Sequence, residues 1–158
     1  MSKDPIFNIV LLCPQIPNNT GNIGRTALAT GCRLHLVHPL AFDLSLKAVR
    51  RSGMDYWREV ELREHDDWKS FLEAEKPNRL WLFTTKSAQP YWNAEFQKGD
   101  FLLFGSEQHG VPDEVHEWVT RDQGDQSRIC LPMEPEARSL NLATAVCTAV
   151  YEGLRQLQ

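Results

Sequence analysis

The segment from Pro14 to Thr26 holds the first group of residues that could do chemistry. Its sequence, PQIPNNTGNIGRT, combines two prolines, three asparagines and two glycines, which favour an irregular backbone whose amides are satisfied by side chains. We expect a loop over 14–22 and a helix over 23–30, with Thr20 or Asn22 as the N-cap. Arg25 would then lie in the first helical turn, where a cation opposes the helix dipole. Such a cation suits a phosphate or a substrate oxygen, although a capped turn with a surface arginine explains the pattern equally well.

A second candidate segment covers residues 102–112, with the sequence LLFGSEQHGVP. An apolar run ends at Gly105, and Gly110 and Pro112 follow, the proline at an expected helix N1 position. Two glycines allow a ligand to approach the backbone closely. The phosphate-binding pattern with Gly-Lys-Ser/Thr and the dinucleotide pattern Gly-x-Gly-x-x-Gly are both missing. A nucleoside held by main-chain hydrogen bonds fits this segment, as does a plain structural turn.

A third candidate segment runs from Ile129 to Ala143. It has a short apolar run, a proline-containing loop, and then Ser139 or Asn141 as the N-cap of a final helix. A helix N-terminus with hydroxyl and amide groups beside it suits a carboxylate or phosphate. Ordinary capping is the alternative explanation.

The surrounding pattern predicts an α/β domain with a mainly parallel sheet, because β-branched apolar runs alternate with helical segments. Gly31 is expected to cap the first helix. Asp66 or Asp67 would start a helix through Glu75 that ends before Pro77. The last helix, over 140–157, has its apolar residues on one face. The predicted strands are 7–13, 34–38, 80–84, 101–104 and 128–131. All three candidate segments follow strands, so we expect them to meet at the carboxyl edge of the sheet.

Size and charge restrict the class of protein. The chain has 158 residues, 42% of them hydrophobic, and a net charge of −4, which fits one soluble globular domain in the cytoplasm. No apolar run is long enough to cross a bilayer, and no secretory signal pattern starts the chain. The acidic balance argues against nucleic-acid binding through bulk charge, but not against a local basic patch. One stretch of mixed charge carries five basic residues, Lys47, Arg50, Arg51, Arg58 and Arg63.

The four cysteines indicate no metal or redox site. Their spacings are wide and no Cys-x-x-Cys occurs. We expect them to be small buried hydrophobic residues. They are Cys13, Cys32, Cys130 and Cys147.

Taken in order, the three segments resemble the signature motifs of the SPOUT superfamily of RNA methyltransferases. The short form with NTGNI, TTK, FGSEQHG and RSLNL is similar to the bacterial tRNA 2′-O-methyltransferases that act on the anticodon wobble nucleotide. The resemblance extends over residues 7–156, and Val150-Tyr151-Glu152 adds to it. It implies an α/β fold with a deep C-terminal trefoil knot, which neither periodicity nor spacing can reveal. It also implies a single methyltransferase domain without an additional RNA-binding domain.

The resemblance implies S-adenosylmethionine as the cofactor and tRNA as the substrate. The expected cofactor contacts are Phe83, Gly105, Leu131 and Ser139, the first and third of them through backbone and apolar contact. Residues expected to bind substrate are Asn22, Arg25, Lys86, Glu107 and Arg138. Arg25, Ser139 and Asn141 are the expected catalytic residues. His109 is another candidate base, but it lies at a variable position of the motif.

Methyl transfer from a sulfonium needs no metal, only alignment of the acceptor oxygen and loss of one proton. Because a guanidinium rarely accepts a proton, Arg25 is expected to orient the 2′-hydroxyl and stabilise its developing negative charge, unless a nearby RNA phosphate assists it as a base.

The implied reaction is methylation of the wobble cytidine or modified uridine in leucine tRNAs by a homodimer whose final helix supports the interface. Two alternatives stay open: methylation of another tRNA or rRNA nucleotide, and a non-catalytic RNA-binding module with the same fold. Gln15 and Gly24 depart from the acidic residue and the bulkier aliphatic residue common at these positions.

Overall fold

The structure is a computed structural model that describes residues 4–45, 48 and 55–158. Its strands are β1 (Asn8–Leu12), β2 (Arg33–Val37), β3 (Leu62–His65), β4 (Leu80–Phe83), β5 (Phe101–Phe104) and β6 (Arg128–Ile129). The described α-helices are α1 (Pro17–Thr30), α3 (Trp68–Glu75), α4 (Asp113–Asp122) and α5 (Leu142–Gln156). No helix in this described part is long and apolar enough to cross a membrane.

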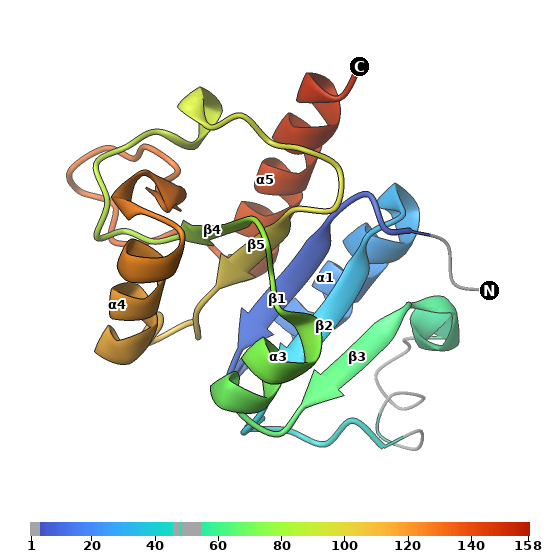
Figure 1. Ribbon diagram of the computed structural model, residues 1–158. Coiled ribbons are helices and arrows are strands. Elements are labelled where there is room, and N and C mark those ends of the chain that lie inside the picture. Colours follow the sequence, from blue (N-terminus) through green and yellow to red (C-terminus); the bar gives the residue numbers. More distant parts are fainter. Residues whose placement is uncertain (1–3, 46–47, 49–54) are drawn as a thin grey trace.

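The six strands form one sheet in the order β3-β2-β1-β5-β4-β6, and each neighbouring pair is parallel. Parallel neighbours need crossover connections, and α1, α3 and α4 each lie within such a connection. All carboxyl ends therefore point to one edge (Figure 1). The predicted α/β class with a mainly parallel sheet is confirmed. The trefoil knot stays a prediction.

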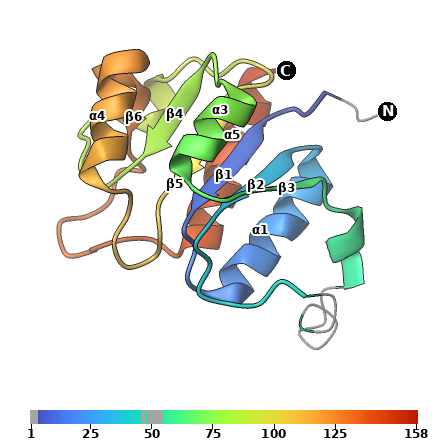
Figure 2. The same ribbon diagram turned by 60° about the horizontal axis from the view of Figure 1, so that its bottom comes forward.

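The sheet separates two apolar layers, and β1 supplies both. Ile9 and Leu11 lie in the cluster beneath α1 and α5, whereas Val10 and Leu12 lie in the cluster beneath α3 and α4. The side-chain period of two in a strand produces this division. Figure 2 shows the two pairs of helices on opposite sides of the sheet. A strand buried on both faces explains why the residues of β1 are almost all apolar.

The first helix begins earlier than predicted. The expected loop over 14–22 is wrong, because α1 starts at Pro17, whose fixed φ and missing N–H suit a first helical position. Neither Thr20 nor Asn22 caps it; both lie inside the helix. Arg25 therefore sits in the third turn, and the expectation that it opposes the helix dipole fails. Gly31 ends the helix in the left-handed conformation, as predicted.

Most other boundaries agree with the sequence to within two residues. Asp67 caps α3 by accepting from the Ser70 amide at 2.7 Å, and β5 has the predicted range. The last strand is shorter than expected and ends at Ile129. Strand β3 was not predicted. It lies at the edge of the sheet, and its two middle residues, Arg63 and Glu64, are exposed and polar. Of the basic stretch, Lys47, Arg50 and Arg51 lie outside the described residues.

The four thiols are free, and only Cys32 is fully buried. The prediction of buried cysteines therefore holds for this residue, while Cys13, Cys130 and Cys147 are half-buried. Burial raises the pKa of the Cys13, Cys32 and Cys130 thiols above the usual value. These three thiols are accordingly poor nucleophiles.

An aromatic ring explains the departure at Gly24. A Cβ at this position would lie 2.5 Å from Cζ3 and 3.0 Å from Cε3 of Trp57. The indole, 9% exposed, thus fills the space that a larger residue on α1 would need. Local packing thus explains the glycine.

We expect Gly24→Ala to lower the free energy of unfolding by about 1–3 kcal/mol, because the added methyl overpacks the contact with Trp57. In a Trp57→Leu background the same change is expected to stabilise by up to about 1 kcal/mol, since alanine is the better helix former. Urea unfolding of the four proteins in this double-mutant cycle measures the sign. An equal cost of Gly24→Ala in both backgrounds would contradict the steric explanation.

Candidate active site at the carboxyl edge of the sheet

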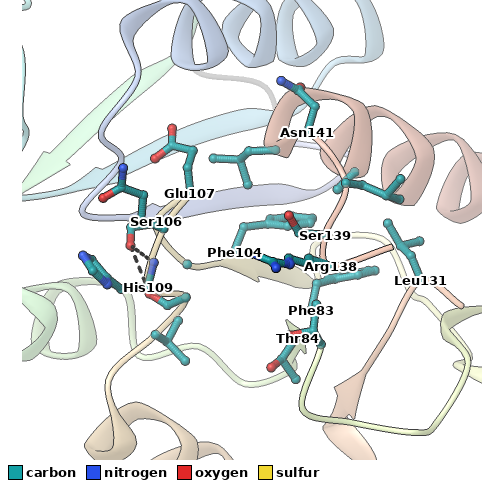
Figure 3. A pocket seen from close by; sticks show the side chains of 18 of the residues that line it. Phe83, Thr84, Phe104, Ser106, Glu107, His109, Leu131, Arg138, Ser139 and Asn141 are labelled. Atoms are coloured by element: carbon teal, nitrogen blue, oxygen red, sulfur yellow. Dashed lines mark hydrogen bonds between the residues drawn. The ribbon is translucent and has the colours of Figure 1, made fainter. Parts of the chain in front are cut away.

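A cavity of about 690 Å³ opens where β4, β5 and β6 end. Its volume lies in the range of small-molecule sites. The segment after each of these strands contributes to its wall, and so do the N-terminal parts of α1 and α5. Figure 3 shows side chains from segments far apart in the sequence facing this space. The expectation that the candidate segments meet at this edge is confirmed.

Most of the predicted site residues line this one cavity. They are Phe83, Lys86, Gly105, Glu107, Leu131, Arg138, Ser139 and Asn141. Asn22 and Arg25 are not among the lining residues; both are exposed on α1. The structure thus brings the expected cofactor residues together and leaves two expected substrate residues outside the cavity of their own chain.

Gly105 lies at a close approach between two stretches of backbone. A Cβ here would collide with the carbonyl group and Cα of Gly110. The two stretches are joined by mutual hydrogen bonds of 3.1 and 3.0 Å between the main chains of Ser106 and Gly110. Gly110 itself has a φ of +64°, in the region that favours glycine. Residues 105–110 are therefore held as a closed turn on the cavity wall.

Glu107 fastens the start of α1 to this turn. Its carboxylate accepts hydrogen bonds from the amides of Gln15, at 2.7 Å, and Ile16, at 3.1 Å. Asn19 Nδ2 lies 3.4 Å from the same group. No side chain of the segment itself caps α1, so a carboxylate distant in sequence satisfies the helix start and complements its dipole. In return the Gln15 side chain accepts from the Gln108 amide at 3.1 Å.

Glu107→Gln should destabilise the protein by about 1.5–3 kcal/mol, because a charged acceptor of two backbone amides is lost and the new amide group cannot accept with both atoms. Thermal unfolding followed by circular dichroism measures the change. Glu117→Gln, on the exposed side of α4, is the matched control and should change stability by less than about 0.5 kcal/mol. Equal stability of the two variants would show that the carboxylate does not hold the turn.

Asn141 is the N-cap of α5, which selects one of the two predicted candidates. Its Oδ1 accepts from the Thr144 amide at 3.1 Å, and its Nδ2 donates to Asn19 Oδ1 at 3.0 Å. The asparagine thus joins the N-terminal parts of α1 and α5 beside the cavity. Ser139 is left to face the cavity as an exposed hydroxyl (Figure 3).

Phe83 contributes to the cavity wall at the end of β4 while its ring is buried. The ring stacks on Phe104 with 4.7 Å between centroids and lies parallel to Phe96 at 6.4 Å. Only 9% of the residue is exposed. The backbone beyond β4 and an aromatic edge are therefore what this position can offer to a ligand.

Arg25 is supported by Tyr56. The guanidinium carbon lies 5.4 Å from the ring centroid, within the range of a cation–π contact. The phenol donates to the Gly21 carbonyl at 2.6 Å, which ties the ring to α1. Burial raises the pKa of this phenol, and Arg25 acts in the opposite direction. Tyr56 thus holds the exposed guanidinium over a fixed ring.

His116 is a cavity residue that sequence reasoning missed. It lies on α4, and its Nδ1 is buried with no hydrogen-bond partner among the described residues. Burial lowers the pKa of the imidazole, and the nearby Arg128 and Lys86 lower it further. The ring is therefore neutral at pH 7, and its Nδ1 is closed off from the cavity. A histidine within an amphipathic helix gave no signal of this position.

Comparison with known proteins gives a consistent identification. The profile of the SpoU rRNA Methylase family matches residues 6–151. The tRNA (cytidine(34)-2'-O)-methyltransferase of Saccharophagus degradans is 43% identical over 96% of both chains. The Escherichia coli enzyme of the same name is also 43% identical, over 96% of this chain and 94% of its own. A solved structure concerned with the 2-OH methylation of C/U34 on tRNA superposes with a TM-score of 0.86, at 42% identity and 98% coverage of each chain. The chain belongs to the SpoU rRNA methylase family.

Proposed function

We propose that this protein transfers a methyl group from S-adenosylmethionine to the ribose 2′-hydroxyl of the wobble cytidine or modified uridine of leucine tRNAs. One observation carries the proposal: the segments after β4, β5 and β6 form one cavity in a chain that is 43% identical to tRNA (cytidine(34)-2'-O)-methyltransferases over nearly its whole length. We further propose that residues 1–158 act as a single methyltransferase domain in the cytoplasm.

The cavity suits an adenosine joined to an amino acid. Phe104, Leu131 and Leu140 provide apolar surface for a base, while the hydroxyl of Ser139 and the backbone around Gly105 provide polar contacts. The sulfonium of S-adenosylmethionine supplies the methyl group. The chain's own part is to hold the nucleoside between the turn over 105–110 and the start of α5.

Lys86 and Arg138 reach the cavity from two different loops. They are the proposed contacts for RNA phosphates, where charge matters more than base identity. Ser139 is proposed to contact the ribose. Arg25 is proposed to orient the 2′-hydroxyl and to stabilise the charge that develops on its oxygen as the proton leaves. Because Arg25 lies outside the cavity of its own chain, we propose that it serves the cavity of a second subunit.

The proposed dimer surface lies on α1 and α5. On α5 the exposed side presents Thr144, Thr148 and Tyr151, the last 54% exposed, and Leu28 on the neighbouring α1 is 41% exposed. Arg25 lies one turn before Leu28 on the same helix. A homodimer packed through this surface would cover the apolar residues and carry the Arg25 of one subunit toward the cavity of the other.

Tyr151→Asp should convert the dimer to monomers, because it places a charge at the centre of an apolar contact. Sedimentation at micromolar concentration measures the mass. Glu117→Gln serves again as the control and should remain dimeric. A Tyr151→Asp protein that stays dimeric and active would exclude this surface as the interface.

Nucleoside mass spectrometry of leucine tRNAs tests the function in the cell. A strain lacking this protein should lose the 2′-O-methyl group at the wobble nucleotide and regain it when the gene is restored. Unchanged methylation there, with loss at another tRNA or rRNA nucleotide, would assign a different acceptor. No loss anywhere would favour the non-catalytic alternative.

A further inference from the structure

A buried cluster on the opposite face of the sheet from α1 and α5 takes no part in the cavity. It consists of His35 on β2, His65 at the end of β3 and Glu75 at the end of α3. None of the three lines the cavity. Among the described residues, this is the one group of three metal-binding side chains whose ligand atoms come together, all within 4.8 Å. The side chains of His35, His65 and Glu75 are 0%, 6% and 8% exposed.

The three separations are compatible with one cation held between the three side chains. His35 Nδ1 lies 3.1 Å from His65 Nε2, and Glu75 Oε1 lies 3.7 and 3.6 Å from these two nitrogens. The two longer separations exceed hydrogen-bond length, so neither ring donates to this carboxylate oxygen, which accepts from Arg63 instead. A point about 2.0 Å from all three atoms exists inside such a triangle, and zinc bonds to nitrogen and oxygen at about that length.

A neighbouring amide orients His35 for metal binding. Asn8 Nδ2 donates to the Gly99 carbonyl at 3.0 Å, which directs Asn8 Oδ1 to His35 Nε2 at 2.9 Å. Because that oxygen only accepts, Nε2 of His35 carries the proton and Nδ1 presents a lone pair to the cluster. An outer partner that fixes the tautomer in this way is the usual companion of a metal-bound histidine.

The remaining surroundings hold the carboxylate and shield the cluster from bulk solvent. Arg63 donates to Oε1 and Oε2 of Glu75 at 3.1 and 3.0 Å, which fixes the carboxylate orientation. The Phe71 ring lies 5.8 Å from His35 and 5.2 Å from His65, and the Phe101 ring lies 5.6 Å from His35. Ion–ligand attraction is strong in such low-dielectric surroundings.

We propose that His35, His65 and Glu75 bind one zinc ion, or a similar borderline divalent metal, that fastens β3 and α3 to β2. Zinc uses a donor set of two imidazoles and one carboxylate, with a water molecule as the fourth ligand. The ion would cross-link the edge strand β3 to the interior of the sheet. Such a link matters there because the middle residues of β3 are exposed and polar. It would do so on the face away from methyl transfer, so its role is structural.

Zinc alone, added to the full-length protein after treatment with a chelator, tests the proposal. Calorimetry should show one ion per chain, and thermal unfolding should shift upward with zinc concentration, because the ion binds the folded state. His65→Gln and Glu75→Gln should each weaken zinc binding at least about tenfold. The matched controls are Glu73→Gln, which alters an exposed glutamate of α3, and His38→Gln, which alters a half-buried histidine paired with Glu64 at 2.8 Å. Both should bind zinc as the parent does. Binding that survives both ligand variants, or no binding by the folded parent, would overturn the proposal.

Cobalt absorption keeps the test independent of how well the variants fold. Cobalt(II) at this site in the unaltered protein should give visible bands of a low-coordinate ion without the near-ultraviolet thiolate band. A strong thiolate band would place the metal on a cysteine and contradict the assignment.

Discussion

Replacing Arg25 with alanine should slow methyl transfer to tRNA by about 10²–10³-fold, the usual cost of removing one group that stabilises transition-state charge. The guanidinium is exposed and contacts the Tyr56 ring rather than the core. Its loss should therefore leave the unfolding temperature within a few degrees of the parent. Binding of S-adenosylhomocysteine should also be unchanged, because Arg25 does not line the cavity. Single-turnover assays and calorimetry measure these quantities.

Two further substitutions separate a catalytic role of Arg25 from a general loss of charge. Arg121→Ala removes an exposed arginine of α4 that pairs with its neighbour Asp122 at 3.2 Å, and it should leave turnover unchanged. Arg25→Lys keeps the charge but loses the planar group, so turnover should recover only in part. Normal turnover by Arg25→Ala would remove this residue from the mechanism.

Gly105→Ala should weaken S-adenosylhomocysteine binding by about 10- to 100-fold, which corresponds to about 1–3 kcal/mol of overpacking. The added methyl would meet the Gly110 backbone, which cannot turn away as a flexible side chain can. The turn that forms the cavity wall must therefore shift. Gly110→Ala is the matched control: it has a strained φ of +64° but nothing within 4 Å of the new Cβ. Its binding loss should be smaller, and equal losses would contradict the steric explanation.

Mixing these two weakened proteins tests whether the site is shared between subunits. If the Arg25 of one chain serves the cavity of its partner, a mixed dimer of Arg25→Ala and Gly105→Ala holds one complete site. About half of the dimers are mixed after random exchange, so the mixture should reach about a quarter of the parent rate. A rate no higher than the average of the two variants would place Arg25 and the cavity of its own chain in the same site.

The sequence predicted the parts of the site that depend on strand ends. Apolar runs located β1, β2, β4 and β5, and the glycines and caps after them marked the segments that line the cavity. Parallel strands bring such segments together whatever their distance along the chain, which is why eight of the predicted residues share one cavity.

Features that depend on distant partners could not be predicted. The start of α1 was missed because its cap, Glu107, lies 91 residues from Ile16. Three of the four residues of β3 are polar, so the strand gave no apolar run to recognise. The cluster of His35, His65 and Glu75 has no recognisable spacing, since its members come from two strands and a helix that only the sheet order brings together.

The most direct test of the central claim is transfer of a labelled methyl group from S-adenosylmethionine to bulk tRNA by the purified protein, followed by mapping of the labelled nucleotide. We expect label on the ribose of the wobble nucleotide of leucine tRNAs, and label that accumulates about 10²–10³-fold more slowly with Arg25→Ala. Label on a base, or on the ribose of any other nucleotide, would contradict it.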